Sequence, residues 1–136
     1  MTDCLFCGIV AGEVPSRRVY EDETCIAFLD IAPFHRGHTL VVPRRHVVDG
    51  TTDAGVWTDV SRGIVAVSTL VKERLMAAGI NILSNAGEVS GQAVFHFHVH
   101  VIPRFVDRPG MNGLLQRNPS AGDDLDSLQA LLLSTM

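Results

Sequence analysis

The chain has 136 residues, of which 46% are hydrophobic and 19% are charged, and its formal net charge at pH 7 is −4. This length fits a single domain, residues 1–136, with a sizeable apolar core. The slightly negative charge provides no basic field for a nucleic-acid polymer, so an anionic ligand would need local donors. No apolar stretch approaches the roughly 18 residues of a membrane span, and residues 1–4 do not begin a signal peptide. We therefore expect a cytoplasmic protein without a membrane partner.

Short strands are expected in the first third of the chain. Residues 18–20 and 25–29 are rich in β-branched, aromatic and other apolar residues and flank the acidic turn 21–24, which predicts a hairpin. A third strand should follow at 38–43, where Pro43 cannot continue a hydrogen-bonded ladder. Together these segments predict one half of a β-sheet.

One long helix is expected from about residue 53 to residue 78. Its apolar residues recur at intervals of three and four, as they do on one face of an α-helix. Thr52 is the candidate N-cap and Gly79 the candidate C-cap. The apolar positions are Trp57, Val60, Ile64, Val67, Val71 and Leu75.

The rest of the chain adds two strands and a short helix. Residues 79–84 and 95–104 favour strands, residues 85–91 a polar loop, and residues 124–133 a terminal helix. This order predicts an α+β fold, in which a mainly antiparallel five-stranded sheet is covered by one long helix and a shorter one.

Three histidines at alternate positions, His96, His98 and His100, form the most informative pattern in the sequence. Successive side chains of a strand point to opposite faces, so all three imidazoles would line one face, roughly 6.6 Å apart. Neutral imidazole, with an unperturbed pKa near ~6.5, can attack phosphorus and return a proton. The row therefore predicts phosphoryl or nucleotidyl transfer, with the central His98 as the nucleophile of a covalent intermediate. The residues that alternate with the histidines would enter the core: Phe95, Phe97, Val99 and Val101.

Two further segments could carry chemistry. The loop from Asn85 to Gln92 offers backbone N–H groups and two side-chain amides, which can hold a phosphate without a basic patch. Cys4 and Cys7 have a Cys-x-x-Cys spacing, which alone is compatible with half of a zinc site, a redox pair or coincidence. The third cysteine, Cys25, is expected to be a buried strand residue.

The segment 92–102 resembles the signature of the histidine triad (HIT) superfamily, His-φ-His-φ-His-φ-φ preceded by Gly-Gln, where φ is a hydrophobic residue. Residues 28–31, residues 38–43 and Asn85 match further family motifs in the same order, so the resemblance spans about residues 4–104. It implies a HIT-like fold and a homodimer whose subunits join their sheets. It also implies a purine-nucleotide hydrolase or transferase that acts at the α-phosphate.

Carried over position by position, the resemblance implies a catalytic set and a binding set. His98 resembles the nucleophile, and His100 and Gln92 resemble the residues that hold the scissile phosphate. His38 resembles a fourth active-site histidine, and His96 completes the triad. The implied nucleotide contacts are Asp30 to the ribose hydroxyls, Phe6, Phe28 and Ile31 around the base, and Asn85 and Gly91 near the phosphate. Without the resemblance, Phe6 and Phe28 would be interpreted as core residues and Asp30 as a turn cap.

The resemblance also indicates how a zinc site could be completed. Several bacterial HIT proteins share the Cys-x-x-Cys pair, a histidine after the third strand and the first triad histidine, which here are Cys4, Cys7, His46 and His96. Such a site has no open position, so the zinc would be structural and the chemistry would require no cofactor.

Three departures from the family pattern leave the leaving group open. Ala93 stands where well-studied members commonly have Ser or Thr, Leu29 stands where the eukaryotic Hint-like branch has histidine, and residues 125–136 lack that branch's tryptophan-containing tail. We expect a phosphoramidase-type or adenylate hydrolase, with a dinucleoside polyphosphate hydrolase as the alternative. Two other classes are a nucleotide-binding regulator with negligible turnover and a catalytic-zinc hydrolase that uses the histidine row.

Overall fold

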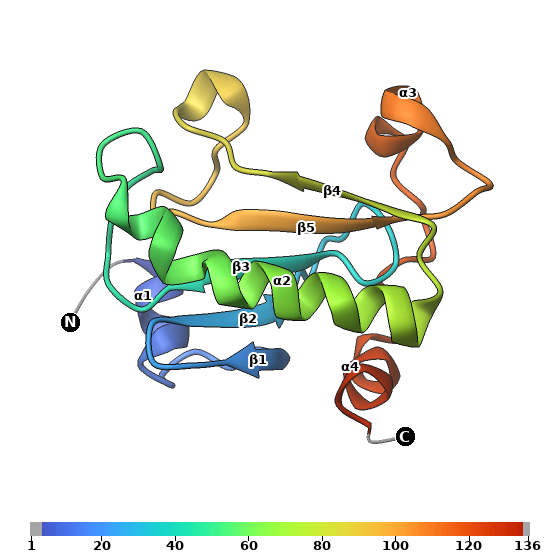
Figure 1. Ribbon diagram of the computed structural model, residues 1–136, viewed down its shortest axis with the longest axis horizontal. Helices are drawn as coiled ribbons and strands as arrows, with labels where there is room; N and C mark the ends of the chain where they lie inside the picture. The colour runs from blue at the N-terminus through green and yellow to red at the C-terminus, as the bar shows by residue number, and fades with distance from the viewer. Residues whose placement is uncertain (1–3, 135–136) are drawn as a thin grey trace.

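Five strands form one antiparallel sheet in the computed structural model, which describes residues 4–134 (Figure 1). Residues 1–3 and 135–136 lie outside the described range, so the structure does not test the expectation about a signal peptide at the first residues. The expected α+β fold with its five-stranded antiparallel sheet is confirmed. The strands are β1 (Arg18–Glu21), β2 (Cys25–Leu29), β3 (Thr39–Pro43), β4 (Gly79–Leu83) and β5 (Val99–Arg104), and they lie in the order β1-β2-β3-β5-β4.

Helices cover the centre of the sheet on both faces. The long helix α2 (Gly55–Leu75) packs across one face, and the short helix α1 (Leu5–Val10) lies against the other (Figure 1). Strand β2 therefore alternates between two cores, because Ala27 contacts the α2 side while Ile26 and Phe28 contact the α1 side. This is the period of two expected of a strand that is buried on both faces.

Helix α2 is confirmed, but both of its predicted caps are wrong. Asp53 rather than Thr52 provides the side-chain acceptor at the start of the helix, since its Oδ1 accepts a hydrogen bond from the N–H of Gly55 at 2.9 Å. The helix ends in the left-handed backbone of Met76, which has a φ of 59°, and Gly79 instead begins β4. A residue in that conformation ends the helix before the predicted glycine is reached. The buried stripe consists of Val56, Val60, Gly63, Val67, Val71 and Leu75.

The histidine segment enters the sheet later than expected. Strand β5 begins at Val99, so the first two triad histidines precede the ladder. The N–H of Phe97 donates to the carbonyl of Val47 at 2.6 Å, in the loop that leaves β3, instead of to a strand partner. This irregular stretch turns Phe95 outward with 46% of its surface exposed, so its predicted place in the core is wrong. Phe97, Val99 and Val101 are buried as expected.

The shorter helices are a mixture of expected and unexpected elements. Helix α4 (Leu125–Leu133) confirms the terminal helix, and a 3₁₀ turn, η1 (Glu88–Ser90), lies in the expected polar loop. Helices α1 and α3 (Gly110–Leu115) fall outside the sequence expectations, because six residues are too few for a periodic signal. Within residues 4–134, no helix is long and apolar enough to cross a membrane.

Candidate active site

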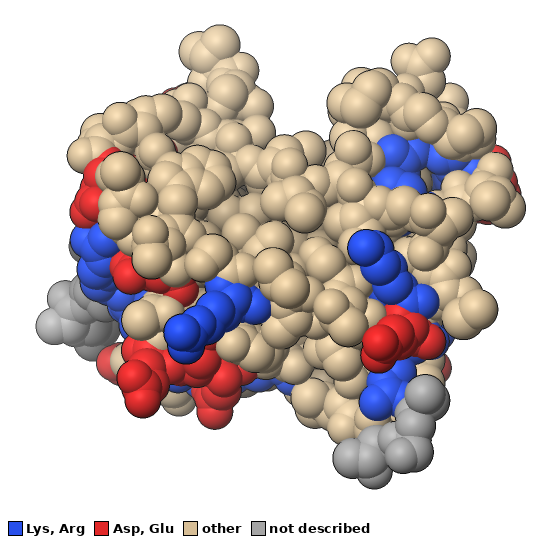
Figure 2. Space-filling view, viewed as in Figure 1, with Lys and Arg blue, Asp and Glu red and all other residues tan. Residues whose placement is uncertain are grey.

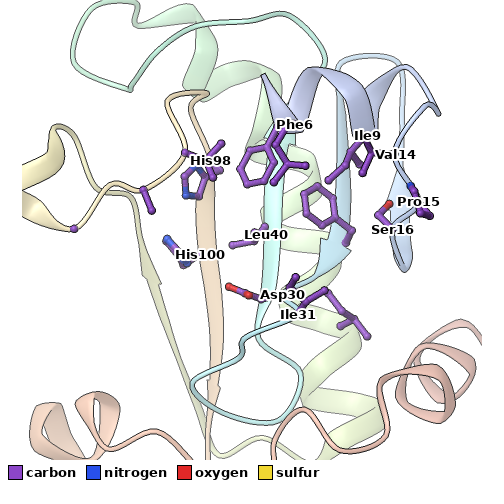
Figure 3. Close-up of a pocket in the computed structure, with 16 residues that line it drawn as sticks. Phe6, Ile9, Val14, Pro15, Ser16, Asp30, Ile31, Leu40, His98 and His100 are labelled. Carbon is purple, nitrogen blue, oxygen red and sulfur yellow. The ribbon is translucent and has the colours of Figure 1, made fainter. Parts of the chain in front are cut away.

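An apolar pocket of about 330 Å³ opens on the sheet face opposite α2 (Figure 3). The imidazoles of His98 and His100 line one side of it, and Phe6 of α1 lies next to His98 (Figure 3). The Phe6 ring meets Phe28 edge-on, with 5.5 Å between centroids, and meets His98 in the same way at 5.0 Å. Ile31 lies at the mouth and is 81% exposed. The aromatic and aliphatic residues that we expected around a base thus share one pocket with two triad histidines.

The hydrogen bond of His98 leaves one ring nitrogen for chemistry. Nδ1 lies 2.8 Å from the carbonyl oxygen of His96, so Nδ1 carries the proton and donates it. Nε2 is then the unprotonated nitrogen of a ring that lines the pocket. Burial lowers the pKa of His98 below its usual value, which keeps the ring neutral at pH 7. A neutral imidazole with an available Nε2 lone pair is the form that attacks phosphorus.

His38 and His100 form a hydrogen-bonded pair beside the pocket. The N–H of Phe34 donates to Nδ1 of His38 at 3.0 Å, so the His38 proton is on Nε2. That nitrogen lies 2.9 Å from Nδ1 of His100 and donates to it. His100 therefore carries its own proton on Nε2. The two histidines that line the pocket therefore differ in the hydrogen-bonding role of Nε2: in His98 this nitrogen is an acceptor, and in His100 it carries a donor N–H.

Asp30 is adjacent to this pair and serves more than one purpose. Its Oδ1 accepts a hydrogen bond from the N–H of Ala32 at 2.8 Å, which is the turn-capping role considered from the sequence. Its Oδ2 lies 3.5 Å from Nε2 of His38. Burial lowers the pKa of His100 to about 4, and it also lowers the pKa of His38, although the Asp30 carboxylate opposes both shifts. Both imidazoles are therefore neutral at pH 7.

A second cavity, of about 460 Å³, adjoins the apolar pocket, and we call it the distal cavity. Asp30, Gly91 and His100 line both spaces, whereas His98 lines the apolar pocket alone. Asn85, which we expected near the phosphate, lines the distal cavity. The two cavities therefore meet at His100 and Gly91, where a phosphate is expected, and at Asp30, which is expected to contact the ribose.

Gln92 is placed differently from the other expected phosphate contacts. It is buried, its Oε1 accepts from the N–H of Gly87 at 2.8 Å, and its Nε2 donates to the carbonyls of Val48 at 2.7 Å and Val94 at 3.1 Å. It lines neither cavity. In this structure its side chain holds the loop in shape, and its contact with a phosphate stays a prediction.

Cys4, Cys7, His46 and His96 come together in a second cluster. Nδ1 of His96 lies 3.5 Å from each sulfur, Nδ1 of His46 lies 3.3 Å from Sγ of Cys7, and the two Nδ1 atoms are 3.2 Å apart. Zn–S bonds of about 2.3 Å and Zn–N bonds of about 2.0–2.1 Å in a tetrahedron separate sulfur from nitrogen by about 3.5 Å and two nitrogens by about 3.3 Å. The measured separations match these values, so the four residues fit a zinc ion.

His96 belongs to this cluster rather than to the pocket. Its Nε2 lies 2.9 Å from the carbonyl oxygen of Pro43 and donates to it, which leaves Nδ1 unprotonated for a metal. The side chain is fully buried and lines neither cavity. The expected single row of imidazoles is therefore divided, with His96 facing the sulfur atoms and His98 and His100 facing the pocket.

Several residues that line the two cavities were not predicted from the sequence. On the short helix α1, the spacing of Phe6 and Ile9 is a weak signal that could have indicated a shared face. Phe34 and Arg117 lie in loops distant in sequence, and no local pattern indicates that they meet. The other unexpected residues of the apolar pocket are Leu5, Val14, Pro15, Ser16, Leu29, Leu40, Ala93 and Val94.

Comparisons with known proteins agree with this geometry. The model of the HIT domain matches residues 11–107. A curated relative, the protein hit of Bacillus subtilis, is 42% identical over 105 residues, which cover 76% of this chain and 72% of the relative.

Two solved structures resemble the whole described fold. A zinc-bound histidine triad family protein from Mycobacterium smegmatis is 39% identical, with a TM-score of 0.78 over 96% of this chain and 93% of the other. A hypothetical histidine triad nucleotide-binding protein from Sulfolobus tokodaii is 30% identical, with a TM-score of 0.76 over 96% and 89% of the two chains.

Proposed function

The chain belongs to the HIT domain family, and we propose that it is a purine-nucleotide hydrolase or transferase that cleaves at the α-phosphate through a covalent intermediate on His98. The observation that carries this proposal is the assignment of protons at the pocket. His98 has its lone pair on Nε2, and His100 beside it has an N–H on Nε2. A phosphate between them would meet a nucleophile and a hydrogen-bond donor.

The apolar pocket is the proposed place of the nucleoside. Phe6 and Phe28 would enclose the purine, and Ile31 would close the mouth. Because the enclosure is apolar, it senses ring size more than ring substituents, so adenine and guanine compounds should be used within a similar range. Asp30 borders the pocket and would accept from the ribose hydroxyls through the oxygen that does not cap the turn.

In the first chemical step, Nε2 of His98 attacks the α-phosphorus. An N–P bond forms, the bond from phosphorus to the leaving group breaks, and the leaving group departs with its electron pair. The ring becomes a cation, which the hydrogen bond from Nδ1 to the carbonyl of His96 stabilises. His100, held by His38, would donate to a phosphate oxygen.

In the second step, water attacks the same phosphorus and breaks the N–P bond. The products are a nucleoside monophosphate and neutral His98. Of the two protons of the water, one stays on the new phosphate oxygen and the other is released to solvent. An amine leaving group takes up one proton from solvent after it departs, so the overall reaction then releases none, whereas a phosphate leaving group departs as an anion. With an alcohol or amine in place of water, the same step is a transfer.

The cluster of Cys4, Cys7, His46 and His96 is the proposed site of one structural zinc ion. When bound, zinc would neutralise two thiolates and fix α1 to the segment that carries the triad, and no step of the reaction depends on it. The relative from Mycobacterium smegmatis is described as zinc-bound. Thiolate ligands require reduced cysteines, so we also propose a reducing, cytoplasmic location.

A homodimer is the proposed assembly, formed along β4. This strand is the outer edge of the sheet, whereas α4 covers the opposite edge, since Gln129 donates to the carbonyl of Arg18 at 2.8 Å. Val65 on α2 and Ile82 on β4 are 67% and 52% exposed beside this edge. The surface over β4 is hollowed and nearly uncharged between two projections (Figure 2). A second copy could continue the sheet there and cover the apolar side chains.

One experiment tests the proposed function against its alternatives. Purified protein would be incubated with adenylated and guanylated compounds that differ in leaving group: phosphoramidates, aminoacyl-adenylates and dinucleoside polyphosphates. We expect release of the nucleoside monophosphate from purine compounds in the presence of a chelator. Tight nucleotide binding with turnover at background would favour a regulator. Immediate loss of turnover on chelation with the fold intact would favour a catalytic metal, for which Asp30, His38 and His100 lie close enough together.

A further inference from the structure

The distal cavity lies where a leaving group would depart. Attack on phosphorus proceeds in line, so the leaving group points away from the attacking nitrogen. His98 lines the apolar pocket but not the distal cavity, and His100 lines both. A nucleoside in the apolar pocket whose phosphate contacts His98 and His100 would therefore project its leaving group into the distal cavity. This step rests on the proposed function.

Arg117 is held at the wall of this cavity by the C-terminal segment. Its guanidinium lies 4.4 Å from the centroid of the Phe34 ring, and Nη1 donates to the carbonyl of Ala32. The Phe34 ring is in turn tilted against His38, with 5.9 Å between centroids. Because the guanidinium is stacked and hydrogen-bonded, its position is fixed more firmly than that of a solvated surface arginine.

The segment that carries Arg117 is itself fastened to the loop that carries His38. Nε2 of His35 lies 3.2 Å from the carbonyl oxygen of Leu114, and the N–H of Asn118 donates to the carbonyl of Phe34 at 2.7 Å. Hydrogen bonds thus occur on both sides of Arg117. Through these bonds, the residues after β5 become part of the wall beside the triad.

The charge of the cavity depends on Arg117. Among the described residues that line it, Arg117 is the one permanent cation and Asp30 the one carboxylate, while His38 and His100 are neutral at pH 7. Arg117 has five N–H donors, and the carbonyl of Ala32 occupies Nη1. The remaining donors match phosphate oxygens, which arginine binds in a bidentate manner.

We propose that the distal cavity receives the leaving group and that Arg117 binds it when it is a phosphate or a longer phosphate chain. The preferred substrates are then nucleotides in which a phosphoanhydride joins the α-phosphate to further phosphate groups. A phosphate leaving group needs no proton at neutral pH, whereas an amine does. Ala93, at the pocket, has no hydroxyl with which to assist an amine.

The first test measures binding and needs no turnover. The affinities of AMP and ADP would be compared in the wild type, in Arg117→Gln and in Arg117→Lys by calorimetry. The second phosphate of ADP enters the distal cavity, so the wild type should prefer ADP to AMP, and Arg117→Gln should reduce this preference about 10- to 100-fold. Arg117→Lys should retain part of it. Arg36→Gln is the matched control, because Arg36 is an exposed cation in the neighbouring loop between β2 and β3 and lines a different cavity.

The second test compares turnover of diadenosine triphosphate with that of adenosine 5′-phosphoramidate. The ratio of their kcat/KM values should fall about 10- to 100-fold in Arg117→Gln and stay unchanged in Arg36→Gln. An equal decrease for both substrates, or an unchanged preference for ADP over AMP, would overturn the proposal. If the wild type cleaves neither compound while Arg117→Gln still loses its preference for ADP, the anionic subsite stands and the proposed catalysis fails.

Discussion

At His98, a single backbone carbonyl determines which ring nitrogen can react. The carbonyl of His96 accepts the Nδ1 proton, so the lone pair must lie on Nε2. In the proposed reaction Nε2 bonds to phosphorus, and the same hydrogen bond would then grow stronger because the ring would carry a positive charge. At His100 the neighbouring His38 has the opposite effect and places the proton on Nε2. Two identical side chains thus acquire different chemistry from their partners.

Asp30 leads to a prediction about the sugar. One oxygen caps the turn at Ala32, and the other is available to accept from ribose hydroxyls. We expect AMP to bind more tightly than 2′-deoxy-AMP by about 1–3 kcal/mol, and Asp30→Asn to shrink that difference. Calorimetry on the four combinations of protein and ligand measures it, with the exposed turn variant Glu23→Gln as the control. Equal affinity of the wild type for both nucleotides would contradict the placement of the ribose.

The neutral His100 gives a prediction about stability and pH. Burial lowers its pKa to about 4, whereas in the unfolded chain it titrates near ~6.5. Between these values the unfolded state binds a proton that the folded state does not, so the free energy of unfolding falls as the pH is lowered through this window. Denaturant unfolding at pH 6 and pH 5 should show a decrease about 1 kcal/mol larger for the wild type than for His100→Asn. The same pH dependence in both proteins would mean that His100 is not buried in neutral form.

Among the elements, helix α1 depends on its surroundings for stability. It has six residues, too few to be stable alone, and it is held by the apolar contacts of Phe6 and Ile9 and by the cysteines at its start. Since Phe6 also lines the pocket, we expect that loss of the cysteine and histidine cluster would change the shape of the pocket. The position of α1 therefore connects the cluster of cysteines and histidines to the pocket in which we propose that the nucleoside binds.

The proposed zinc site gives the prediction at this scale. Protein purified without chelators should contain about one zinc ion per chain by elemental analysis, and Cys7→Ala should contain none. A chelator should lower the Tm of the wild type by at least about 5 °C, because structural zinc contributes directly to folding, and it should not change the Tm of Cys7→Ala. The turnover of molecules that remain folded should decrease much less. Wild-type protein without bound metal would refute the assignment.

The elements that follow from sequence are those with a clear period or with strand-forming residues beside a turn. The hairpin at 18–29, the strand that ends at Pro43 and the helix α2 lie where their patterns indicate. The start of β5 could not be predicted in this way. The N–H of Phe97 binds a loop carbonyl from another part of the chain, and the alternation of side chains alone does not reveal such a partner.

At the scale of the whole molecule, the open edge at β4 is where we propose that a second copy of the chain binds. If a second copy adds its sheet there, Ile82→Lys should place a charge in the interface and convert a dimer into a monomer. Leu133→Lys introduces the same charge at an exposed apolar position of α4 and should leave the dimer intact. Sedimentation velocity distinguishes the two forms. A wild-type monomer at micromolar concentration, or an Ile82→Lys variant that remains dimeric, would rule out this interface.

The part of the candidate site that belongs to sequence motifs was predictable. The spacing of His98 and His100 predicted a shared face, and the structure brings both to one pocket with Phe6 and Phe28. The separation of His96 from that row, the proton positions and the place of Arg117 were not predictable. His96 and Arg117 depend on hydrogen bonds between segments distant in sequence, and the His98 proton depends on the local bend that brings the carbonyl of His96 to its ring, which side-chain spacing does not encode.

The most direct test of the account is to trap the intermediate on His98. The compound that is cleaved fastest in the substrate panel would be mixed with the protein and quenched within milliseconds in alkaline denaturant, because acid hydrolyses the N–P bond. Mass spectrometry should find one nucleoside monophosphate unit per chain, mapped to His98, and His98→Ala should lack it and turn over at least about 10³-fold more slowly. A unit attached to another residue, or near-normal turnover in His98→Ala, would contradict the account.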